Sequence, residues 1–344
     1  MRFAAIIRLI DVSDGPLEGE NQLNFICHTV VSSEILIAWL AIWTARSCLR
    51  ETTLVSAWVW SVVVLAAWTF SWFVDSIYSA ISVQLADHLW YASAVVALCP
   101  PISVLGSRSP GSRVWNSFIM LPMLLTLGWP VIALAFQGSE LRGLHLETPQ
   151  LVAFSLVLIM GVGNYFGTRY TIPAILYGGS ILALVVSMTM VSPQWLLDRS
   201  VTRFWCVAII SLAVCLAWKS TNISTRNRFD RVWFDFFDTF GIVWGRRIQD
   251  RVNFIAKKEG LPVQLELNGF VWDHSQIRGT ESENRKSKPN HDDPAPALRD
   301  ISEVESRMEH ILRWLLRRFV EPPWIDQRLG TTAKSEIAGM NVDS

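Results

Sequence analysis

Charge is scarce in this chain. Only 17% of its 344 residues are charged, against roughly 25% in a typical soluble protein. The 30 Lys and Arg balance the 30 Asp and Glu, so the formal net charge is zero. A nucleic-acid-binding protein would carry a clear basic excess, so we expect no nucleic-acid partner. The five cysteines form no CxxC pair and no metal spacing.

Motifs that carry enzyme chemistry are also missing. The sequence holds no HExxH, no GxSxG and no Walker loop. Lys219 ends the last apolar segment instead of lying in its middle, which argues against a retinal Schiff base. We therefore assign no catalytic residue, no cofactor and no metal, and we lean towards a protein that is not an enzyme.

The few charges are unevenly distributed along the chain. They occupy 21 of the first 218 residues but 39 of the last 126. This contrast excludes a single soluble globule. It predicts a membrane part followed by a tail exposed to water.

Apolar runs long enough to cross a bilayer recur through the first part, since a spanning helix needs about 20 predominantly apolar residues. The sequence predicts an all-α fold, with a seven-helix transmembrane bundle over 24–218. Residues 167–169 form the bend of a tight hairpin, and Pro173 opens the next helix. The seven candidate runs are 24–45, 52–74, 89–107, 114–139, 148–168, 170–197 and 204–218.

The distribution of Lys and Arg between the short loops predicts the orientation in the membrane. Placing the N-terminus outside gives eight basic residues on the inner side and five on the outer side. We therefore predict a multi-pass protein of the inner (plasma) membrane, with an external segment over 1–23 and a cytoplasmic C-terminus. The inner set is Arg46, Arg50, Arg108, Arg113, Arg169, Lys219, Arg226 and Arg228, and the outer set is Arg2, Arg8, Arg142, Arg199 and Arg203. Arg203 is expected to snorkel to the interface.

The tail begins with an amphipathic helix followed by one short strand, within 219–272. Apolar and aromatic side chains recur at steps of three and four from Phe229 to Ile255, and the segment 260–262 stops the helix. Two destinations for this apolar stripe stay open: the inner leaflet, or a second helix of the tail. The alternation at Val263, Leu265 and Leu267 predicts the strand.

The rest of the tail alternates between polar and helical stretches. Residues 273–296 have the composition of a disordered linker. Apolar residues at helical spacing predict a second amphipathic helix over 297–324, ended by Pro322 and Pro323. Residues 325–344 are expected to be a disordered tail.

Glu34 is the sharpest candidate for a polar site in the membrane. It lies near the middle of the first predicted span, where an unpaired charge is costly. A carboxylate that couples transport to protons or ions is one reading. A glutamic acid that holds helices together is the other, and we favour it.

Four residues at the outer side form a second candidate: His28, Asp75, Asp87 and His88. Two histidines with two carboxylates could bind a divalent cation or act as acid and base. Their spacing matches no metal motif, so solvated interface residues are the favoured reading.

Several helices carry residues that interrupt or thin them. Pro100, Pro101, Pro122 and Pro130 fall within the third and fourth runs, and small residues with Asn164 fall within the fifth. Broken helices can line a substrate path. Close packing of helices explains the same residues, and we favour it.

Three runs of sequence carry a resemblance: 97–115 with its Pro100-Pro101 pair, 163–169, and 229–233. They resemble multi-pass inner-membrane proteins of planctomycete-type bacteria, over roughly 50–272. That family has no assigned activity. The resemblance implies an inner-membrane location and no catalytic residues.

Three functions follow from these patterns. We favour a non-catalytic membrane scaffold, embedded in the lipid bilayer, whose cytosolic helical module docks a protein partner. The alternative is a secondary transporter that uses Glu34 at the bilayer midplane. The third is a membrane enzyme that works at the outer His and Asp residues.

Overall fold

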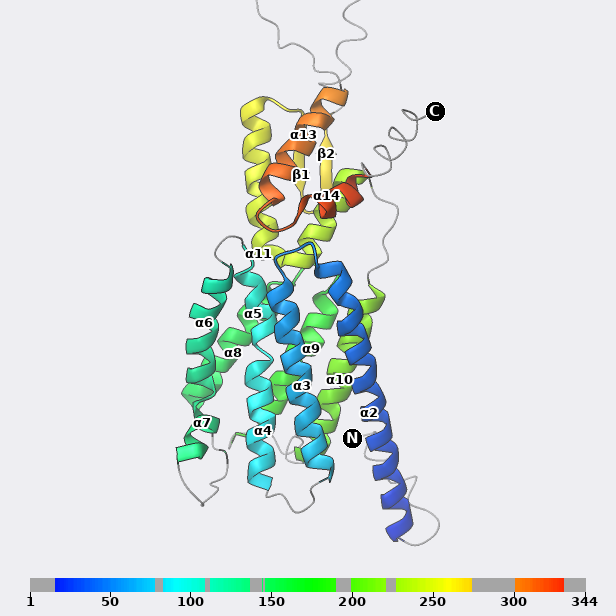
Figure 1. The fold of residues 1–344 in the computed structure, drawn as a ribbon, viewed down its shortest axis with the longest axis vertical. Coiled ribbons are helices and arrows are strands. Elements are labelled where there is room, and N and C mark those ends of the chain that lie inside the picture. Colours follow the sequence, from blue (N-terminus) through cyan, green and yellow to red (C-terminus); the bar gives the residue numbers. More distant parts are fainter. Residues whose placement is uncertain are drawn as a thin grey trace, which may run out of the picture.

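Helices make up most of the structure, as the all-α prediction requires, and they are arranged in two parts (Figure 1). The computed structural model describes residues 16–77, 83–108, 112–136, 144, 146–189, 199–220, 227–273 and 301–330. One part is a bundle of helices that run along the long axis of the molecule. The other is a smaller module, built from the C-terminal tail, on one end of the bundle.

The bundle contains both long and short apolar helices. Among the described residues, four helices have the length and composition to cross a membrane: Thr29–Leu49, Val55–Ser76, Gln84–Leu105 and Val201–Lys219. Shorter apolar helices cover Phe118–Leu127, Thr148–Gly163 and Thr171–Ser187. The full elements are α2 (Pro16–Leu49), α3 (Val55–Ile77), α4 (Val83–Val96), α5 (Cys99–Leu105), α6 (Ser112–Leu127), α7 (Trp129–Phe136), α8 (Thr148–Gly163), α9 (Thr171–Ser187) and α10 (Arg199–Lys219).

The outward surface of the bundle is rich in exposed apolar side chains. A soluble protein rarely exposes large contiguous apolar areas, whereas a bilayer requires them. Exposed members from five of the helices are Leu36, Leu40, Trp43, Val59, Phe70, Phe73, Phe118, Leu121, Leu125, Leu156, Ile159, Ile172 and Ile175. The protein therefore has the surface of a membrane protein.

Two helices of the bundle are interrupted, and at each break a tyrosine hydroxyl donates a hydrogen bond to a backbone carbonyl. Pro101 has no N–H to donate to the carbonyl four residues earlier, that of Ala97. The Tyr177 hydroxyl donates to this carbonyl oxygen at 2.6 Å. At the second break, between α6 and α7, the Tyr91 hydroxyl donates to the Leu127 oxygen at 2.7 Å. The breaks are thus internally satisfied, which favours a structural role for the interrupted helices.

Removing the Tyr177 hydroxyl should therefore destabilise the bundle. We expect Tyr177→Phe to lower the free energy of unfolding by about 1 kcal/mol, because a buried carbonyl loses its partner. Unfolding by sodium dodecyl sulfate in mixed micelles would measure this. Tyr165→Phe is the control, since no hydrogen bond from the Tyr165 hydroxyl is found within the described part of the chain, and it should be neutral. Equal effects of the two changes would contradict the assignment.

Helices α8 and α9 form the hairpin that the sequence predicted. The turn between them, residues 164–170, has its bend at Gly167, whose φ is +79°. Two glycines allow the hairpin to pack closely. A Cβ at Gly161 would lie 3.0 Å from the Pro101 side chain, and one at Gly178 would lie 2.9 Å from that of Val162. Small residues at helix contacts serve close packing here, as expected.

The tail module is organised around α11 (Arg228–Glu259), which bends at Gly241, where φ is +79° and ψ is −179°. The stripe of aromatic and apolar side chains from Phe229 to Ala256 is buried in the module's own core, together with residues of α13 (Ile301–Leu316) and α14 (Pro322–Leu329). Of the two possibilities left open, the stripe therefore packs against other helices of the tail. The same core includes Leu54, Ala57 and Val104 from the bundle.

A β-hairpin lies against α11, where one strand was expected. Strand β1 (Val263–Glu266) pairs antiparallel with β2 (Gly269–Trp272) in the register Val263 opposite Trp272. Gly269, at φ +116°, begins β2, and a Cβ there would lie 2.5 Å from the Asp230 carboxylate. That carboxylate accepts a hydrogen bond from the Phe270 N–H at 2.8 Å. Leu267 and Asn268 form the two-residue loop between the strands, and Gly269, with its positive φ, is the first residue of β2.

Pro322 and Pro323 open a helix instead of ending the ordered tail. Proline suits the first turn of a helix, where an N–H has no partner in any case, and both residues stand in the first turn of α14. Ile325 and Leu329 join the core of the tail, so the ordered part continues past residue 324. At the other end of the chain, α2 begins at Pro16, within the predicted segment 1–23. The predicted linker after 273 and the tail after 330 lie outside the described residues.

Candidate functional site

A cluster of three charged side chains lies in the bundle at the end away from the tail. Arg203 of α10 donates from Nη1 to both carboxylate oxygens of Asp75, at 3.1 and 3.0 Å. Its Nη2 donates to Asp87 at 2.5 Å. Arg203 is 4% exposed and Asp87 1%. Ion pairs this deeply buried are strongly coupled, because little water screens them.

Helix ends bring these three residues together. Asp75 lies in the last turn of α3 and Asp87 in the first turns of α4, so the short connection between the two helices places both carboxylates at one end of the bundle. Trp90, also from α4, donates from its indole N–H to Asp75 at 3.2 Å, and its ring lies 5.9 Å from the Arg203 guanidinium. The predicted snorkelling of Arg203 is replaced by an inward ion pair.

Only part of the predicted outer site converges. Asp75 and Asp87 meet, but they meet on Arg203. His88 is buried, with Nδ1 at 2.6 Å from the Gln84 carbonyl oxygen of its own helix. The backbone of His28 belongs to α2, and its side chain lies outside the described residues. Within the part of the chain that the structure describes, no group of three His, Cys, Asp or Glu side chains is arranged to hold a metal.

Glu34 stands at the edge of the buried face of α2. Its neighbours Val31, Ile35 and Ala38 are buried, and Glu34 itself is half-buried. One carboxylate oxygen is enclosed and finds no hydrogen-bond partner among the described residues. A functional role for the Glu34 carboxylate stays a prediction.

Asn164 lies at the opposite end, where the bundle meets the tail. Its carbonyl oxygen accepts from the Ile242 N–H at 2.7 Å, and its side-chain oxygen accepts from the Val243 N–H at 3.1 Å. Its side-chain amide donates to the Phe240 carbonyl at 3.1 Å. One residue of the α8–α9 turn therefore binds the backbone on both sides of the bend at Gly241.

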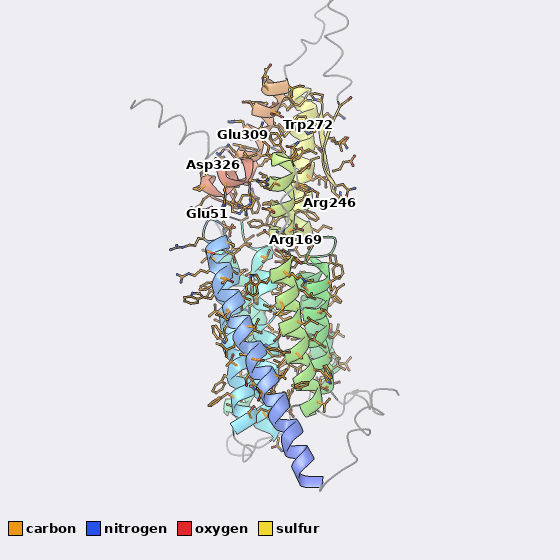
Figure 2. All side chains as sticks on the ribbon, turned by 90° about the vertical axis from the view of Figure 1, so that its right-hand side faces the viewer. Glu51, Arg169, Arg246, Trp272, Glu309 and Asp326 are labelled. Carbon is orange, nitrogen blue, oxygen red and sulfur yellow. The ribbon has the colours of Figure 1, made fainter. Side chains whose placement is uncertain are left out.

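The same turn holds a second part of α11 by charge. The Arg169 backbone N–H donates to Asp238 at 2.9 Å, and its guanidinium is paired with Asp238 at 3.2 Å and with Asp235 at 3.7 Å. Figure 2 shows Arg169 at the level where the tail meets the bundle. Asp238 is buried within the aromatic stripe of α11. We call the contacts of Asn164 and Arg169 with α11 the joint.

Further contacts extend the attachment to the connection between α2 and α3 and to α5. The Phe319 carbonyl accepts from both the backbone N–H and the hydroxyl of Thr53, at 2.9 and 3.1 Å. The Glu321 N–H donates to the Glu51 carbonyl at 2.8 Å. The Trp244 indole donates to the Val104 carbonyl at 3.2 Å. The tail is thus fixed to three separate places on the bundle.

Arg328 connects α14 to this charged network. Its guanidinium donates to Asp235 at 2.8 Å and lies over the Trp324 ring at 3.8 Å from the ring centre. Burial lowers the pKa of Arg328, and the Asp235 carboxylate opposes that change. Asp235 therefore lies between two guanidiniums, those of Arg169 and Arg328.

Sequence reasoning selected Asn164 for its place in a span and missed its role at the joint. It also missed Arg203, Asp235 and Asp238. A usable signal existed for Asp238, since a carboxylate within an apolar stripe requires a partner. No local signal identifies Arg203 as a member of a buried ion pair, because its partners lie more than 100 positions away in the chain.

Comparison of the chain with protein-family models, with curated proteins and with solved structures gives no match. The resemblance to planctomycete-type membrane proteins therefore stays a prediction, and the function must be inferred from the geometry.

Proposed function

We propose that this protein is a non-catalytic scaffold of the inner membrane, with seven spans and a cytoplasmic tail module that docks a protein partner. The joint is the observation that carries this proposal. A tail fixed by Asn164, Arg169 and the contacts at Thr53 is held in one orientation. A fixed orientation serves the presentation of a surface, whereas a tethered enzyme or a disordered tail does not need it.

The distribution of arginines supports the cytoplasmic side for the tail. Arg46, Arg50, Arg108 and Arg169 all belong to the end of the bundle that bears the tail. Loops rich in Arg and Lys are retained in the cytoplasm. At the other end Arg203 is neutralised by two aspartates. Seven spans follow if the interrupted pairs α4–α5 and α6–α7 each cross once.

Reporter fusions test this topology. Fusions after Ser107 and after Ser220 should report the cytoplasm, and a fusion after Gly138 should report the outside. The positive-inside rule fixes these expectations. Reversed signals at all three positions would overturn the proposed orientation without touching the helical bundle itself.

The docking function requires a partner that binds the tail. We expect a partner to be recovered in constant ratio with the tagged full chain from detergent-solubilised membranes. It should be lost with Val271→Glu, because Val271 is an exposed apolar residue of β2. Gln264→Glu is the matched control. Gln264 is the cross-strand neighbour of Val271 in the β1–β2 pairing, and the change adds the same charge without removing an apolar side chain. A partner retained by a chain ending at Ser220 would contradict docking on the tail.

A secondary transporter is the second candidate, and Glu34 favours it. An enclosed carboxylate oxygen without a partner within the described residues is typical of a site that exchanges a proton or an ion. Proton flux into proteoliposomes that is abolished by Glu34→Gln, with no partner recovered from membranes, would replace the scaffold with this function. The third candidate, an enzyme at the outer His and Asp residues, loses support because Arg203 engages both aspartates.

A further inference from the structure

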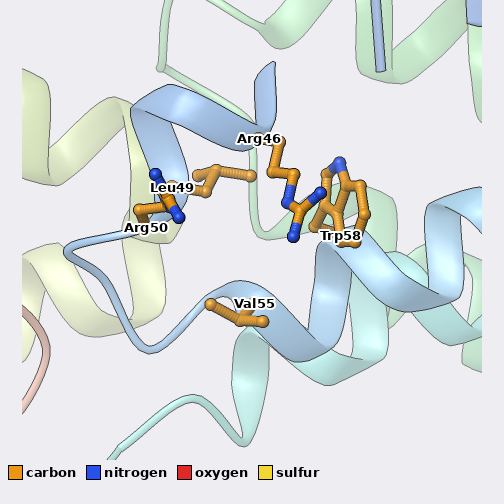
Figure 3. Close-up of a pocket in the computed structure, with 5 residues that line it drawn as sticks. All are labelled: Arg46, Leu49, Arg50, Val55 and Trp58. Carbon is orange, nitrogen blue, oxygen red and sulfur yellow. The ribbon is translucent and has the colours of Figure 1, made fainter. Parts of the chain in front are cut away.

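A small pocket lies where α2 ends and α3 begins, beneath the tail module. Its volume is about 230 Å³, and it is lined by Arg46, Leu49, Arg50, Val55 and Trp58. Figure 3 shows the Arg46 guanidinium beside the Trp58 ring, Arg50 on the other side of Leu49, and Val55 on α3 across from them. The lining thus combines two cations with an apolar wall.

Among the described residues, the two guanidiniums have no carboxylate partner. No ion pair of Arg46 or Arg50 is found within the part of the chain that the structure describes, whereas Arg169, Arg203, Arg228, Arg307, Arg313 and Arg328 are all paired. Arg46 instead lies 5.3 Å from the centre of the Trp58 ring and 5.7 Å from that of Trp43. The Trp58 ring is held by its N–H, which donates to the Ile42 carbonyl at 2.8 Å. The Trp58 side of the site is therefore held in place, and the two positive charges take part in no ion pair with the described residues.

We expect the pocket to stand at the level of lipid headgroups, because Arg46 lies in the last turn of α2, near the end of the candidate span Thr29–Leu49. Arg46 is twelve positions beyond Glu34, or about 18 Å of helix at 1.5 Å per residue. Half of a bilayer core is about 15 Å, so with Glu34 at its predicted place at the bilayer midplane, an arginine at this position leaves the hydrocarbon. Tryptophans such as Trp43 and Trp58 favour the same interfacial level. Below the pocket, Leu40 and Val59 are exposed on the outward surface, where acyl chains lie.

We propose that this pocket binds the phosphate of an anionic phospholipid from the leaflet on the tail side. Two guanidiniums separated by one helical turn can each donate two hydrogen bonds to phosphate oxygens. Trp58, Val55 and the apolar surface below them contact the glycerol and the first acyl carbons. The proposal uses only the membrane location and is independent of the scaffold function.

Native mass spectrometry of the full chain with equal amounts of phosphatidylglycerol and phosphatidylcholine tests the proposal. We expect phosphatidylglycerol to be retained in preference. Each of Arg46→Gln and Arg50→Gln should weaken its binding about fivefold, and the double variant about 25-fold, as expected for one surface arginine each. Unchanged preference in the double variant would overturn the proposal.

A matched control separates the pocket from total charge. Lys257→Gln combined with Lys258→Gln removes the same charge from two exposed positions at the end of α11 far from the bundle (Figure 1). This variant should retain the full preference. An equal loss in the control would assign the binding to net charge instead of to the pocket. The two single arginine variants, both at exposed positions, keep the test valid if the double variant does not fold.

A soluble phosphate is the other source of the same chemistry. The measurement is therefore repeated with 10 mM inorganic phosphate, roughly the scale at which weak anion sites fill. Retention of the lipid without competition supports the phospholipid. Displacement of the lipid by phosphate, or phosphate adducts on the lipid-free chain that disappear in the double variant, would assign the pocket to a soluble anion and overturn the lipid proposal.

Discussion

Replacing Arg203 with methionine should lower the free energy of unfolding of the bundle by about 3–5 kcal/mol, the usual cost of removing one partner of a buried ion pair. Two carboxylates, Asp75 and Asp87, would then face each other without a counter-charge. Methionine keeps most of the apolar volume, so the loss reports charge and hydrogen bonds more than packing. Unfolding by sodium dodecyl sulfate in mixed micelles, followed by far-UV circular dichroism, measures it.

Removing the two aspartates as well should reverse much of this loss. Asp75→Asn and Asp87→Asn, combined with Arg203→Met, leave neutral groups in the same space, and breaking a pair costs more than replacing the whole set. Arg317→Met, at an exposed position of the tail, is the control and should lie within about 0.5 kcal/mol of the parent chain. If Arg203→Met has the same free energy of unfolding as the parent chain, the cluster contributes nothing to stability.

Gly241→Ala should detach the tail from the bundle at the joint. The backbone at Gly241 lies in a region that only glycine adopts readily, and a Cβ there would lie 2.4 Å from the Asn164 carbonyl oxygen. Strain and collision together should cost about 3 kcal/mol or more. Amide hydrogen exchange at Ile242 and Val243, whose N–H groups bind Asn164, should accelerate by about 100-fold, as that free energy implies.

Gly260→Ala is the control for backbone strain alone. Gly260 also has a positive φ, +63°, but a Cβ there meets no atom within 4 Å. It should cost about 1 kcal/mol and leave exchange at Ile242 unchanged. Asn164→Ala should reproduce part of the effect of Gly241→Ala, since it removes two of the three hydrogen bonds. Slow exchange at Ile242 in both joint variants would show that the tail is held elsewhere.

Local patterns predicted the features of this fold that local forces determine. Apolar runs identified the helices of the bundle, and the stop at Gly260 coincides with the observed end of α11. The bend at Gly167 was predictable because one charge and one glycine interrupt a long apolar run. The destination of the aromatic stripe was not, since an inner leaflet and a neighbouring helix present the same apolar surface.

Long-range pairing is what the sequence left undetermined. Arg203 had an adequate local explanation as a snorkelling residue, so nothing indicated that Asp75 and Asp87 would surround it. From the preceding apolar stripe alone, Pro322 indicates the end of a helix. In the structure it begins α14, next to Glu321, whose N–H donates to the Glu51 carbonyl. In both cases the deciding contact joins segments that are distant in the chain.

The turn between α8 and α9 binds α11 both before and after its bend at Gly241, so the tail is attached directly to the α8–α9 hairpin. Arg169 holds the arm before Gly241, and Asn164 holds the arm after it. Helices tilt when the surrounding bilayer becomes thinner or thicker. Because the tail also binds the α2–α3 connection and α5, we expect a tilt of this hairpin within the bilayer either to strain those contacts or to move the tail together with the bundle.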